Sequence, residues 1–376
     1  MRSNNTLEKW EEKTINDVCI VERGSSPRPI KNFVTSDNSG VNWIKIGDCS
    51  GKYVTNTAQK ITIEGAKKSR AVKVGDFIIS NSMSYGKPYI LKIDGFIHDG
   101  WFVLRLNKNL VNADYFYYLL SSNYIREQYD ALATGAIVQN ISSDLIKKVK
   151  FKLPPLPEQE RIVAKLDKAF EAIDKVKANA EQNLTNAKEL FESTLYSLCN
   201  DKKANWTTGR LDNYFVLQRG FDLPKQDRKK GQYPLVSSNG ITDFIDTYKI
   251  KRPVVVTGRS GTIGSVHYVD ENSWPLNTTL YVKDFKDNVP KYIFYYLKSL
   301  NLAEYSSGAG VPTLNRNYIH EIIISFPLQS EQQKIVEKLD VLQEQTKQLE
   351  QIYTQKIKEC DELKQSILQK AFRGEL

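Results

Sequence analysis

The chain has 376 residues, 26% of them charged, and a net charge of +9 at pH 7. This length is sufficient for two domains with connecting segments. No apolar run approaches the ~20 residues that cross a bilayer, and the polar residues 1–13 lack the apolar core of a secretory signal. We therefore expect a soluble, intracellular protein.

Cysteine and histidine are too few and too scattered to suggest a metal site. No CxxC pair occurs, and the histidines do not stand at spacings typical of zinc ligands. We expect reduced core cysteines and no bound metal. The residues concerned are Cys19, Cys49, Cys199, Cys360, His98, His267 and His320.

The first block of the chain, residues 1–156, is rich in strand patterns. Its first 13 residues suggest a short polar helix or arm, and TINDVCIVERG then suggests a strand running into a turn. Short apolar or alternating runs bounded by Gly, Asn, Asp and Ser predict further strands: VNWIKIG, DFIIS, PYILKI and WFVLRL. A helical aromatic stretch, the loop TGAIVQN and a last strand that ends at proline complete the block.

A long helix is predicted at residues 157–200, because apolar residues recur there at alternating steps of three and four. Lys177 and Thr194 interrupt this seam. The apolar positions are Leu166, Phe170, Ile173, Ala180, Leu184, Ala187, Phe191 and Leu198.

The second block, residues 201–329, repeats the order of the first. GRLDNYFVLQRG predicts a strand into a turn, and YPLVSS, VVVTG, TIGSVHYV and TTLYVKD predict the middle strands. PKYIFYYLKSL is the helical aromatic stretch, followed by the loop SGAGVPTLN and a strand that ends at proline.

A second long helix is predicted at residues 330–376, with interruptions at Thr346 and Lys356. Two segments near 40 residues greatly exceed the usual helix of roughly 11–12 residues, and a sustained 3.5-residue period calls for a partner helix. Two separate amphipathic helices are the alternative to one helix pair. The second seam contains Ile335, Leu339, Leu342, Leu349, Tyr353, Cys360, Leu363 and Ile367.

The two halves are copies of one unit. PEQERIVAKLD at residues 157–167 and SEQQKIVEKLD at 330–340 are separated by 173 positions, and seven of the ten residues from Glu158 and Glu331 onward are identical. Further upstream, Arg23-Gly24 matches Arg219-Gly220 at a separation of 196. A repeat of this kind predicts two similar folded units. We predict an α+β protein in which two globular α/β domains are joined by a long antiparallel two-helix coiled coil with pseudo-two-fold symmetry.

The aromatic stretches of the two blocks also correspond, and we match Tyr117-Tyr118-Leu119 with Tyr295-Tyr296-Leu297. These tyrosines could form a base-stacking platform, or they could pack a helix onto the sheet. Aromatic residues at helical spacing are typical of a core, which favours the second interpretation.

All the excess positive charge lies in the two globular blocks. Residues 1–156 carry a net charge of +7 and residues 201–329 carry +5, whereas the helical segments carry −2 and −1. This distribution is typical of a protein with a polyanionic partner.

No stretch of the sequence matches a known catalytic motif in full. GRSGTIGS at residues 258–265 lacks the Lys-Ser/Thr pair of a phosphate-binding loop and no long helix pattern follows it, so we predict a hairpin turn. LPPLP at 153–157 lacks the residues that flank the Pro-Pro of an amino-methyltransferase loop. His98-Asp99 is an isolated pair that we assign to a loop or strand-edge hydrogen bond.

Polar and basic loops are the remaining candidates for function. Asn can contact adenine in a bidentate manner, Ser adapts as donor or acceptor, and Lys and Arg contact phosphate or guanine. The candidate DNA-binding residues are Arg28, Lys31, Lys45, Ser80, Asn81, Ser82, Ser84, Tyr85, Lys87, Arg219, Ser237, Ser238, Asn239, Arg259, Ser260, Thr262, Asn277 and Thr278.

Several motifs make the chain resemble the specificity subunit of type I restriction–modification enzymes. They are LPPLPEQERIVAKLD and FPLQSEQQKIVEKLD at the helix starts, ELFESTLYSLC and ELKQSILQKAFRGEL near the helix ends, and GTIGSV with WPLNTTLYV. The resemblance spans essentially the whole chain. It implies target-recognition domains at residues 1–156 (with a short N-terminal arm) and 201–329, and spacer helices at 157–200 and 330–376, the last with a C-terminal tail.

In that family each recognition domain reads one half of a split DNA site. The resemblance implies a non-catalytic subunit of the prokaryotic cytoplasm that binds double-stranded DNA, two adenine-N6 methyltransferase subunits and two translocase–nuclease subunits. It implies no cofactor in this chain, with S-adenosylmethionine, ATP and Mg in the partner subunits. We assign the repeated helix starts to the spacer and to subunit docking: Glu158, Gln159, Ile162, Leu166, Glu331, Gln332, Ile335 and Leu339.

Because the middles of the two blocks differ, we expect an asymmetric bipartite target. The alternative from another class is a non-catalytic coiled-coil scaffold whose basic domains bind protein partners. A self-sufficient methyltransferase or nuclease is disfavoured by the missing motifs.

Overall fold

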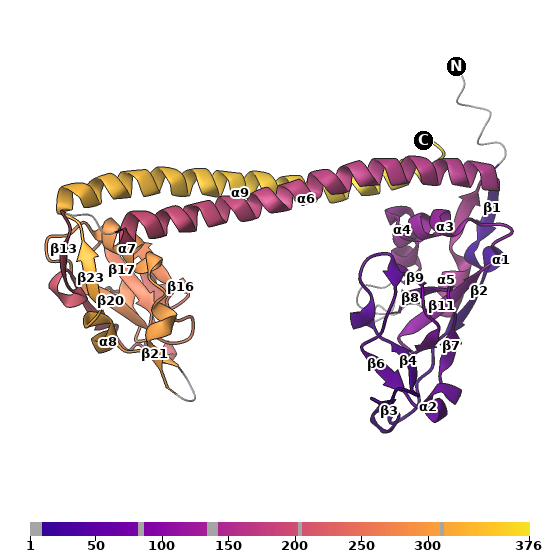
Figure 1. Cartoon of the computed structure of the whole chain (residues 1–376), viewed down its shortest axis with the longest axis horizontal. Helices are drawn as coiled ribbons and strands as arrows, with labels where there is room; N and C mark the ends of the chain where they lie inside the picture. The colour runs from indigo at the N-terminus through magenta and orange to yellow at the C-terminus, as the bar shows by residue number, and fades with distance from the viewer. Residues whose placement is uncertain (1–9, 82–85, 134–141, 202–204, 309–311) are drawn as a thin grey trace, which may run out of the picture. The chain divides into compact units, whose positions relative to one another are not determined.

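The computed structural model describes residues 10–81, 86–133, 142–201, 205–308 and 312–376. Its contacts divide the chain into two compact units, which are described separately (Figure 1). Unit 1 comprises residues 1–179 and 356–376, and unit 2 comprises residues 180–355. The two long helices, α6 (Leu156–Asn200) and α9 (Gln329–Phe372), each contribute to both units.

The described residues of unit 1 form three sheets, with strand orders β1-β12, β3-β6-β4-β10-β7 and β2-β11-β8-β9-β5. Its strands are β1 (Glu11–Thr14), β2 (Cys19–Arg23), β3 (Val34–Thr35), β4 (Val41–Ile44), β5 (Tyr53–Val54), β6 (Gln59–Ile61), β7 (Arg70–Val72), β8 (Phe77–Ser80), β9 (Pro88–Leu91), β10 (Gly95–Ile97), β11 (Trp101–Leu106) and β12 (Lys150–Leu153). Its shorter helices are α1 (Ile15–Val18), α2 (Ile63–Lys67), α3 (Ala113–Leu120), α4 (Asn123–Ala133) and α5 (Ser143–Lys148).

The sheet that contains β8 and β11 has an apolar core on each face. Phe77 and Phe102 lie in the larger core with α3, α4 and α5, whereas Ile78 and Val103 lie in a second core with residues of the other five-stranded sheet. Successive residues of a strand point to opposite faces, so strands buried on both sides read as continuous apolar runs. This accounts for the sequences FIIS and WFVL.

The first described residues of unit 1 differ from the prediction. Glu11–Thr14 form β1, paired antiparallel with β12, instead of a helix or free arm. The strand predicted to begin at Thr14 begins only at Cys19, because Thr14 and Asp17 form a capping box that starts the short helix α1. The Thr14 N–H donates to Asp17 Oδ2 over 2.7 Å. Residues 1–9 lie outside the described part of the chain.

In the part of unit 2 that the structure describes there are four sheets, with strand orders β13-β23, β14-β20-β17-β18, β16-β15-β19 and β21-β22. Its strands are β13 (Thr207–Arg210), β14 (Val216–Arg219), β15 (Lys230–Ser237), β16 (Gly240–Ile245), β17 (Val254–Gly258), β18 (Val266–Val269), β19 (Trp274–Pro275), β20 (Thr279–Asp284), β21 (Ser306–Ser307), β22 (Thr313–Leu314) and β23 (Ile323–Phe326). Its shorter helices are α7 (Pro290–Ser299) and α8 (Arg316–His320).

The central sheet of unit 2 is covered on both faces in the same manner. Val255 and Leu280 face a core that includes α7, whereas Val256 and Tyr281 face a separate cluster. Both units therefore place an aromatic helix on one face of a sheet that is antiparallel throughout in unit 2 and antiparallel except for the β5–β9 pair in unit 1. The predicted fold class is confirmed.

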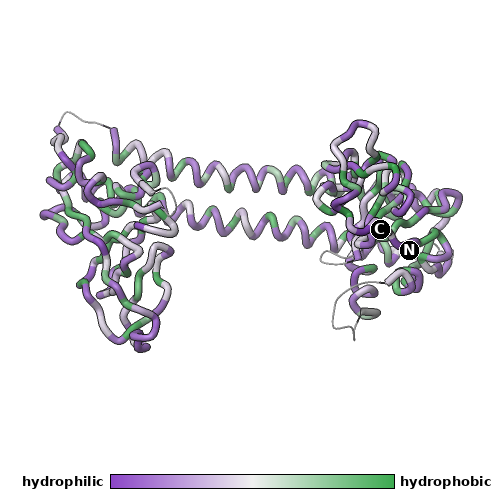
Figure 2. The backbone as a smooth tube through the Cα atoms, turned by 90° about the horizontal axis from the view of Figure 1, so that it is seen from below, coloured by the Kyte–Doolittle hydropathy of each residue, from purple (hydrophilic) through white to green (hydrophobic). Residues whose placement is uncertain are grey.

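Within each unit, the segments of α6 and α9 lie side by side, and Figure 2 shows apolar residues recurring along both. In unit 1, two ion pairs cross between the helices: Lys177 Nζ to Asp361 Oδ1 at 2.7 Å, and Lys364 Nζ to Asp174 Oδ1 at 2.5 Å. In unit 2, one apolar cluster contains residues of both helices, namely Phe191, Leu195, Cys199, Ile335, Val336 and Leu339.

The predicted seam of α6 is confirmed, but that of α9 is wrong at two positions. Leu349 and Leu363 are 39% and 50% exposed, whereas Thr346, predicted as an interruption, is only 9% exposed. The 173-residue repeat explains the difference, because it matches Thr346 with the buried Ile173. The buried side of α9 therefore includes the polar residue Thr346. Apolar spacing alone predicted Leu349 and Leu363 instead, which lie on the exposed side of the helix.

The aromatic helices pack on the sheets, as the favoured interpretation predicted. Tyr115, Tyr118, Tyr292 and Tyr295 are buried. The proposed match of Tyr117 with Tyr295 is wrong by one residue. Tyr118 and Tyr295 are equivalent, since their hydroxyls donate to the repeated aspartates Asp167 (2.5 Å) and Asp340 (2.6 Å).

Within the described residues, no helix is long and apolar enough to span a membrane. The same part of the chain contains no cluster of three or more His, Cys, Asp or Glu suited to a metal ion. The four cysteines are free thiols, and burial raises the pKa of Cys19, Cys49 and Cys199 to about 12.

Candidate nucleic-acid interface

In each unit, the second strand ends in an arginine that is followed by a glycine. Arg23 ends β2 and Arg219 ends β14, and the following Gly24 and Gly220 cross close to a neighbouring loop. A Cβ atom on either glycine would overlap a backbone carbonyl oxygen of that loop, that of His98 or that of Leu276. Glycine therefore allows the Arg-bearing turn to lie directly against the loop.

In unit 1, Asp99 is the centre of a polar cluster. Its carboxylate accepts hydrogen bonds from Ser26 Oγ at 2.7 Å and Arg28 Nη2 at 3.0 Å. Its backbone carbonyl accepts from Arg23 Nε at 3.1 Å and Asn81 Nδ2 at 2.9 Å. The Ser26 hydrogen bond and the Arg28 charge hold the pKa of the Asp99 carboxyl below its usual value, so Asp99 is ionised at neutral pH.

A cavity of about 550 Å³ adjoins this cluster and is lined by residues 26–31, Trp43, His98 and Asp99. It includes the predicted residues Arg28 and Lys31. Burial lowers the pKa of His98, which keeps the imidazole neutral, and its Nδ1 accepts the Gly100 N–H at 3.0 Å. The predicted loop hydrogen bond is confirmed.

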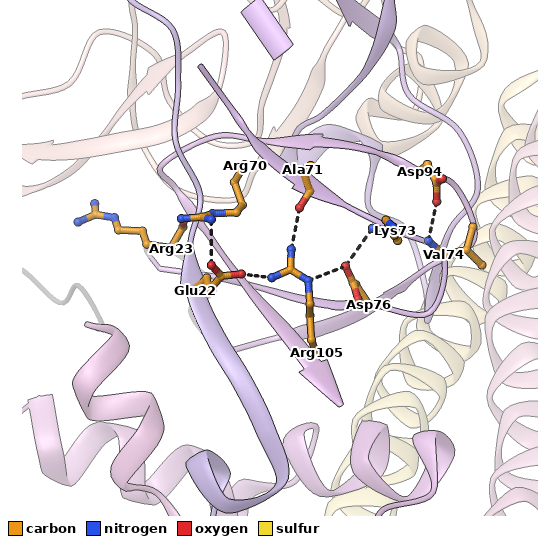
Figure 3. A network of polar contacts seen from close by, with 9 residues as sticks. All are labelled: Glu22, Arg23, Arg70, Ala71, Lys73, Val74, Asp76, Asp94 and Arg105. Carbon is orange, nitrogen blue, oxygen red and sulfur yellow. Dashed lines mark hydrogen bonds and ion pairs between the residues drawn. The ribbon is translucent and has the colours of Figure 1, made fainter. Parts of the chain in front are cut away.

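An ionic network lies behind Arg23 and joins the two five-stranded sheets of unit 1 (Figure 3). Glu22 on β2 pairs with Arg70 on β7 at 2.9 Å and with Arg105 on β11. Arg105 also donates to the Ala71 carbonyl at 2.8 Å, and Arg70 Nε donates to the Arg23 carbonyl at 3.1 Å. Arg70, on the other sheet, thereby fixes the backbone at the end of β2, where Arg23 lies.

In unit 2, Asp222 is the central carboxylate. It accepts from Arg219 Nη2 at 3.2 and 3.3 Å and from the Asn277 side-chain amide. Arg259 Nη1 donates to the Asn277 carbonyl at 3.4 Å. A cleft of about 620 Å³ is lined by Arg219, Asp222, Arg259 and Arg316, among others, so three guanidinium groups share it with one carboxylate.

The sequence 258–265 forms a hairpin connection, as predicted. It joins the antiparallel strands β17 and β18, and Gly261 and Gly264 adopt φ values of +80° and +79° that favour glycine. The Thr262 hydroxyl donates to the Asn239 side chain, and Ser265 donates to the Ser238 carbonyl. The turn between β15 and β16 therefore packs against this loop.

The structure brings several predicted residues together and separates others. Asn81 and Ser80 are only 8% and 2% exposed, and Asn81 supports the Asp99 loop through its hydrogen bond to the Asp99 carbonyl. A direct contact of Asn81 with a base stays a prediction. Lys45 donates to Gln59 Oε1 at 2.9 Å, and Lys87 lines a separate cavity of about 330 Å³ with Tyr117 and Asn123.

Ser82, Ser84 and Tyr85 lie outside the described residues. Ser237 and Ser260 are part-exposed, and Thr278 uses its carbonyl to accept the Arg259 N–H at 2.8 Å.

Most residues assigned to subunit docking are internal. Ile162, Leu166, Ile335 and Leu339 are at most 3% exposed, and Gln159 and Gln332 are fully buried. These six side chains are enclosed within their own unit and hold the start of each long helix in place, as a spacer role requires. Their part in subunit docking stays a prediction. Glu158 pairs with Arg161 at 2.6 Å, and Glu331 accepts from Trp206 Nε1 at 3.1 Å.

Both glutamines accept one backbone N–H and donate two hydrogen bonds, but one acceptor differs: a backbone carbonyl for Gln159 and a side-chain oxygen for Gln332. Gln159 accepts the Asn112 N–H at 2.8 Å and donates to the carbonyls of Leu110 (3.0 Å) and Pro154 (2.8 Å). Gln332 accepts the Val289 N–H at 2.9 Å and donates to Asn288 Oδ1 (2.6 Å) and the Pro327 carbonyl (2.9 Å). This side chain joins the long helix to the turn before the aromatic helix in each unit.

Sequence reasoning missed four residues of the two clusters: Ser26, Asp99, Asp222 and Arg316. Asp99 and Asp222 carry the charge of the predicted partner, so an anionic partner gives no reason to expect them at the site. Alignment of the loop 98–101 with 276–279, which face the repeated Arg-Gly turns, would have matched Asp99 with the predicted residue Asn277.

Comparison with known proteins identifies the family. The model of the type I restriction modification DNA specificity domain matches residues 7–186 and again residues 203–359. A putative type I restriction enzyme MjaX specificity subunit from Methanocaldococcus jannaschii is 25% identical over 92% of this chain and 90% of its own length. The type I restriction enzyme EcoBI specificity subunit of Escherichia coli is 25% identical over 73% of this chain and 68% of its own length.

Solved structures share the fold over nearly the whole chain. One, from a study of complex assembly and conformational transition of the type I R-M system, has a TM-score of 0.81 at 21% identity and covers 98% of both chains. The HsdS subunit from Thermoanaerobacter tengcongensis has a TM-score of 0.58 at 21% identity and covers 98% of this chain and 97% of its own. The family model matches both copies of the repeat and together they cover most of the chain. The chain therefore belongs to the family of type I restriction–modification DNA specificity subunits.

Proposed function

We propose that this chain selects the DNA target of a type I restriction–modification complex. Each unit reads one half of a bipartite, asymmetric double-stranded site, and the chain itself carries out no bond-breaking step. Methyl transfer with S-adenosylmethionine and ATP-dependent translocation and cleavage with Mg belong to partner subunits.

The observation that carries this proposal is a repeated frame with different polar side chains. Both units hold an Arg-Gly turn against a loop, yet the cluster contains Ser26, Arg28 and Asp99 in one and Asp222, Arg259 and Asn277 in the other. Equal frames with unequal side chains suit two half-sites of different sequence. The net positive charge of both globular blocks suits the phosphate backbone that both must approach.

Two identical methyltransferase subunits would need two equivalent docking surfaces. Two pairs of exposed apolar residues are related by the 173-residue repeat: Val176 (44% exposed) with Leu349 (39%), and Leu190 (60%) with Leu363 (50%). An apolar side chain left in solvent at equivalent places of both helices supports docking by two copies of one partner, and we extend the same stoichiometry to the translocase–nuclease subunits.

The function is tested by assembling the chain with the methyltransferase subunits of its host and mapping methylated adenines across a genome. We expect methylation at one bipartite sequence with a fixed gap and unequal halves. Methylation without sequence dependence would overturn the proposal.

Docking is tested separately with Leu190→Asp and Leu363→Asp. Both side chains are exposed, so we expect normal folding of the isolated chain and weaker assembly with the methyltransferase. Glu189→Gln, a neighbouring exposed substitution, is the control. Unchanged assembly in both leucine variants would contradict this surface.

The scaffold alternative predicts no DNA binding. For a DNA-binding chain, the logarithm of the association constant falls linearly with the logarithm of salt concentration as phosphate counterions are released. A complex that shows no measurable binding to duplex DNA at low salt would support the scaffold.

A further inference from the structure

The two polar clusters occupy equivalent positions in the two units. The Gly24 N–H donates to the Trp101 carbonyl at 2.8 Å, and the Gly220 N–H donates to the Thr279 carbonyl at 3.0 Å. This equates the turn that starts at residue 23 with the turn that starts at 219, and the loop 98–101 with the loop 276–279.

The third loop of the cluster follows the same correspondence. The Asn81 N–H donates to the Gly100 carbonyl at 3.0 Å, and the Arg259 N–H donates to the Thr278 carbonyl at 2.8 Å. Asn81 and Arg259 are therefore equivalent, and in both units this side chain donates to the carbonyl of the central loop residue, Asp99 or Asn277.

The chemistry at two of these positions is exchanged between the units. Ser26 is equivalent to Asp222, and Asp99 is equivalent to Asn277. In each unit the two side chains hydrogen-bond to each other, but the carboxylate stands on the loop in unit 1 and on the Arg-Gly turn in unit 2. The position of the negative charge has changed while the contact has been retained.

In each unit the carboxylate holds one exposed arginine by a single terminal nitrogen. Asp99 holds Arg28, whose side chain is 81% exposed, and Asp222 holds Arg219, whose side chain is 50% exposed. A guanidinium restrained by a carboxylate can present its remaining N–H groups in a fixed orientation, as bidentate contact with guanine O6 and N7 requires.

We propose that Arg28 and Arg219 each recognise a guanine in one half-site, and that Asp99 and Asp222 are the positioning residues that make this contact specific. The inference rests on the proposed function. A carboxylate beside DNA weakens binding to every sequence through repulsion of phosphates, so its presence needs a reason of this kind. Orientation of the guanidinium supplies that reason.

The test uses the full chain assembled with its methyltransferase subunits, once the methylated site is known. Binding is measured to the cognate duplex, to duplexes in which each G·C pair of one half-site is replaced, and to an unrelated duplex. For Asp222→Asn we expect the preference for one G·C pair in one half-site to fall about tenfold, with binding to the unrelated duplex unchanged or tighter. Asp99→Asn should act on the other half-site only.

Arg219→Lys retains the charge but cannot make the bidentate contact, so the same preference should be lost. Asp246→Asn, an exposed aspartate of unit 2 outside the cluster, makes the same change in charge and should alter all duplexes equally. If Asp222→Asn behaves like Asp246→Asn, or if Arg219→Lys retains the preference, the inference is overturned.

This failure is distinguishable from failure of the proposed function. A wild-type complex with no sequence preference would contradict the function itself. A wild-type preference that the Asp222 and Arg219 variants leave intact would contradict only the role of these residues. Thermal unfolding of each variant, expected to match the wild type, excludes misfolding as the cause.

Discussion

The two units share the contacts that hold the frame and differ in the contacts that face outward. Gln159 and Gln332 make matching hydrogen bonds in buried surroundings, and Tyr118 and Tyr295 bond to the repeated aspartates. The exposed clusters instead exchange Ser, Asp and Asn. Buried polar groups cannot change without leaving a partner unsatisfied, whereas exposed groups can exchange partners with water.

The units also differ in how the sheet is supported. In unit 1, Glu22 and Arg105 belong to the ionic network that links two sheets, whereas Gln218 and Lys283 occupy the equivalent positions of unit 2. The first block has 23 more residues than the second between its matched turn and the later repeat, and its second sheet has five strands where that of unit 2 has three. The ionic network therefore occurs in the unit whose second sheet, β3-β6-β4-β10-β7, is the larger one.

The largest expected effect tests whether the glutamine contacts are equivalent. Gln159→Ala or Gln332→Ala leaves three buried or part-buried polar groups without their partner, at about 1–3 kcal/mol for each fully buried group. We expect about 3 kcal/mol less stability in the unit concerned, measured by hydrogen exchange of each unit. Gln333→Ala, an exposed neighbour, should have little effect. Loss in one unit but not the other would break the equivalence.

A reciprocal exchange tests the corrected helix seam. Ile173→Thr should lower the stability of unit 1 by about 1–2 kcal/mol because apolar burial is lost, and Thr346→Ile should raise that of unit 2 by about 1 kcal/mol. Urea unfolding monitored for each unit measures both. Loss of apolar surface at the exposed residues, by Val176→Thr or Leu349→Thr, should change the stability of either unit little. A larger effect at Leu349 than at Thr346 would restore the seam inferred from apolar spacing.

The tyrosine register gives a smaller effect. Tyr118→Phe and Tyr295→Phe each remove a hydrogen bond to a carboxylate and should cost about 1–2 kcal/mol, measured by thermal unfolding. Tyr117→Phe retains the aromatic ring and should cost less. The equivalence of Tyr118 and Tyr295 would be supported if Tyr118→Phe and Tyr295→Phe destabilise the aromatic helix of their own unit. A larger loss of stability in Tyr117→Phe would contradict it.

The smallest effect concerns pH and unit 2. His320 Nε2 accepts the Leu217 N–H at 2.9 Å, and burial, with Arg316 and Arg210, lowers the histidine pKa against the opposing charge of Asp212. The unfolded chain then binds the proton more readily, so this stability is present above about pH 6.5 and is lost as pH falls through the lower folded pKa. Exchange of the Leu217 amide, corrected for intrinsic rate, should accelerate below that pH.

His320→Gln keeps a side-chain oxygen that can accept the bond but does not titrate, so the pH step in Leu217 exchange should disappear. Lys147 stands at the corresponding place of unit 1. A step that persists in His320→Gln would assign the pH dependence to another group.

The repeat, the two long helices, the strand-rich blocks and the resemblance to the family follow from the residues alone, because apolar periodicity and duplicated motifs are local or directly comparable along the chain. Which polar residues meet depends on the folded chain. Ser26, Asp99 and Asn81 are far apart in sequence, and their contact depends on how the strands of one sheet are ordered. The seam at Thr346 and the burial of Gln159 were also decided there, since burial depends on what packs against a side chain and not on its polarity.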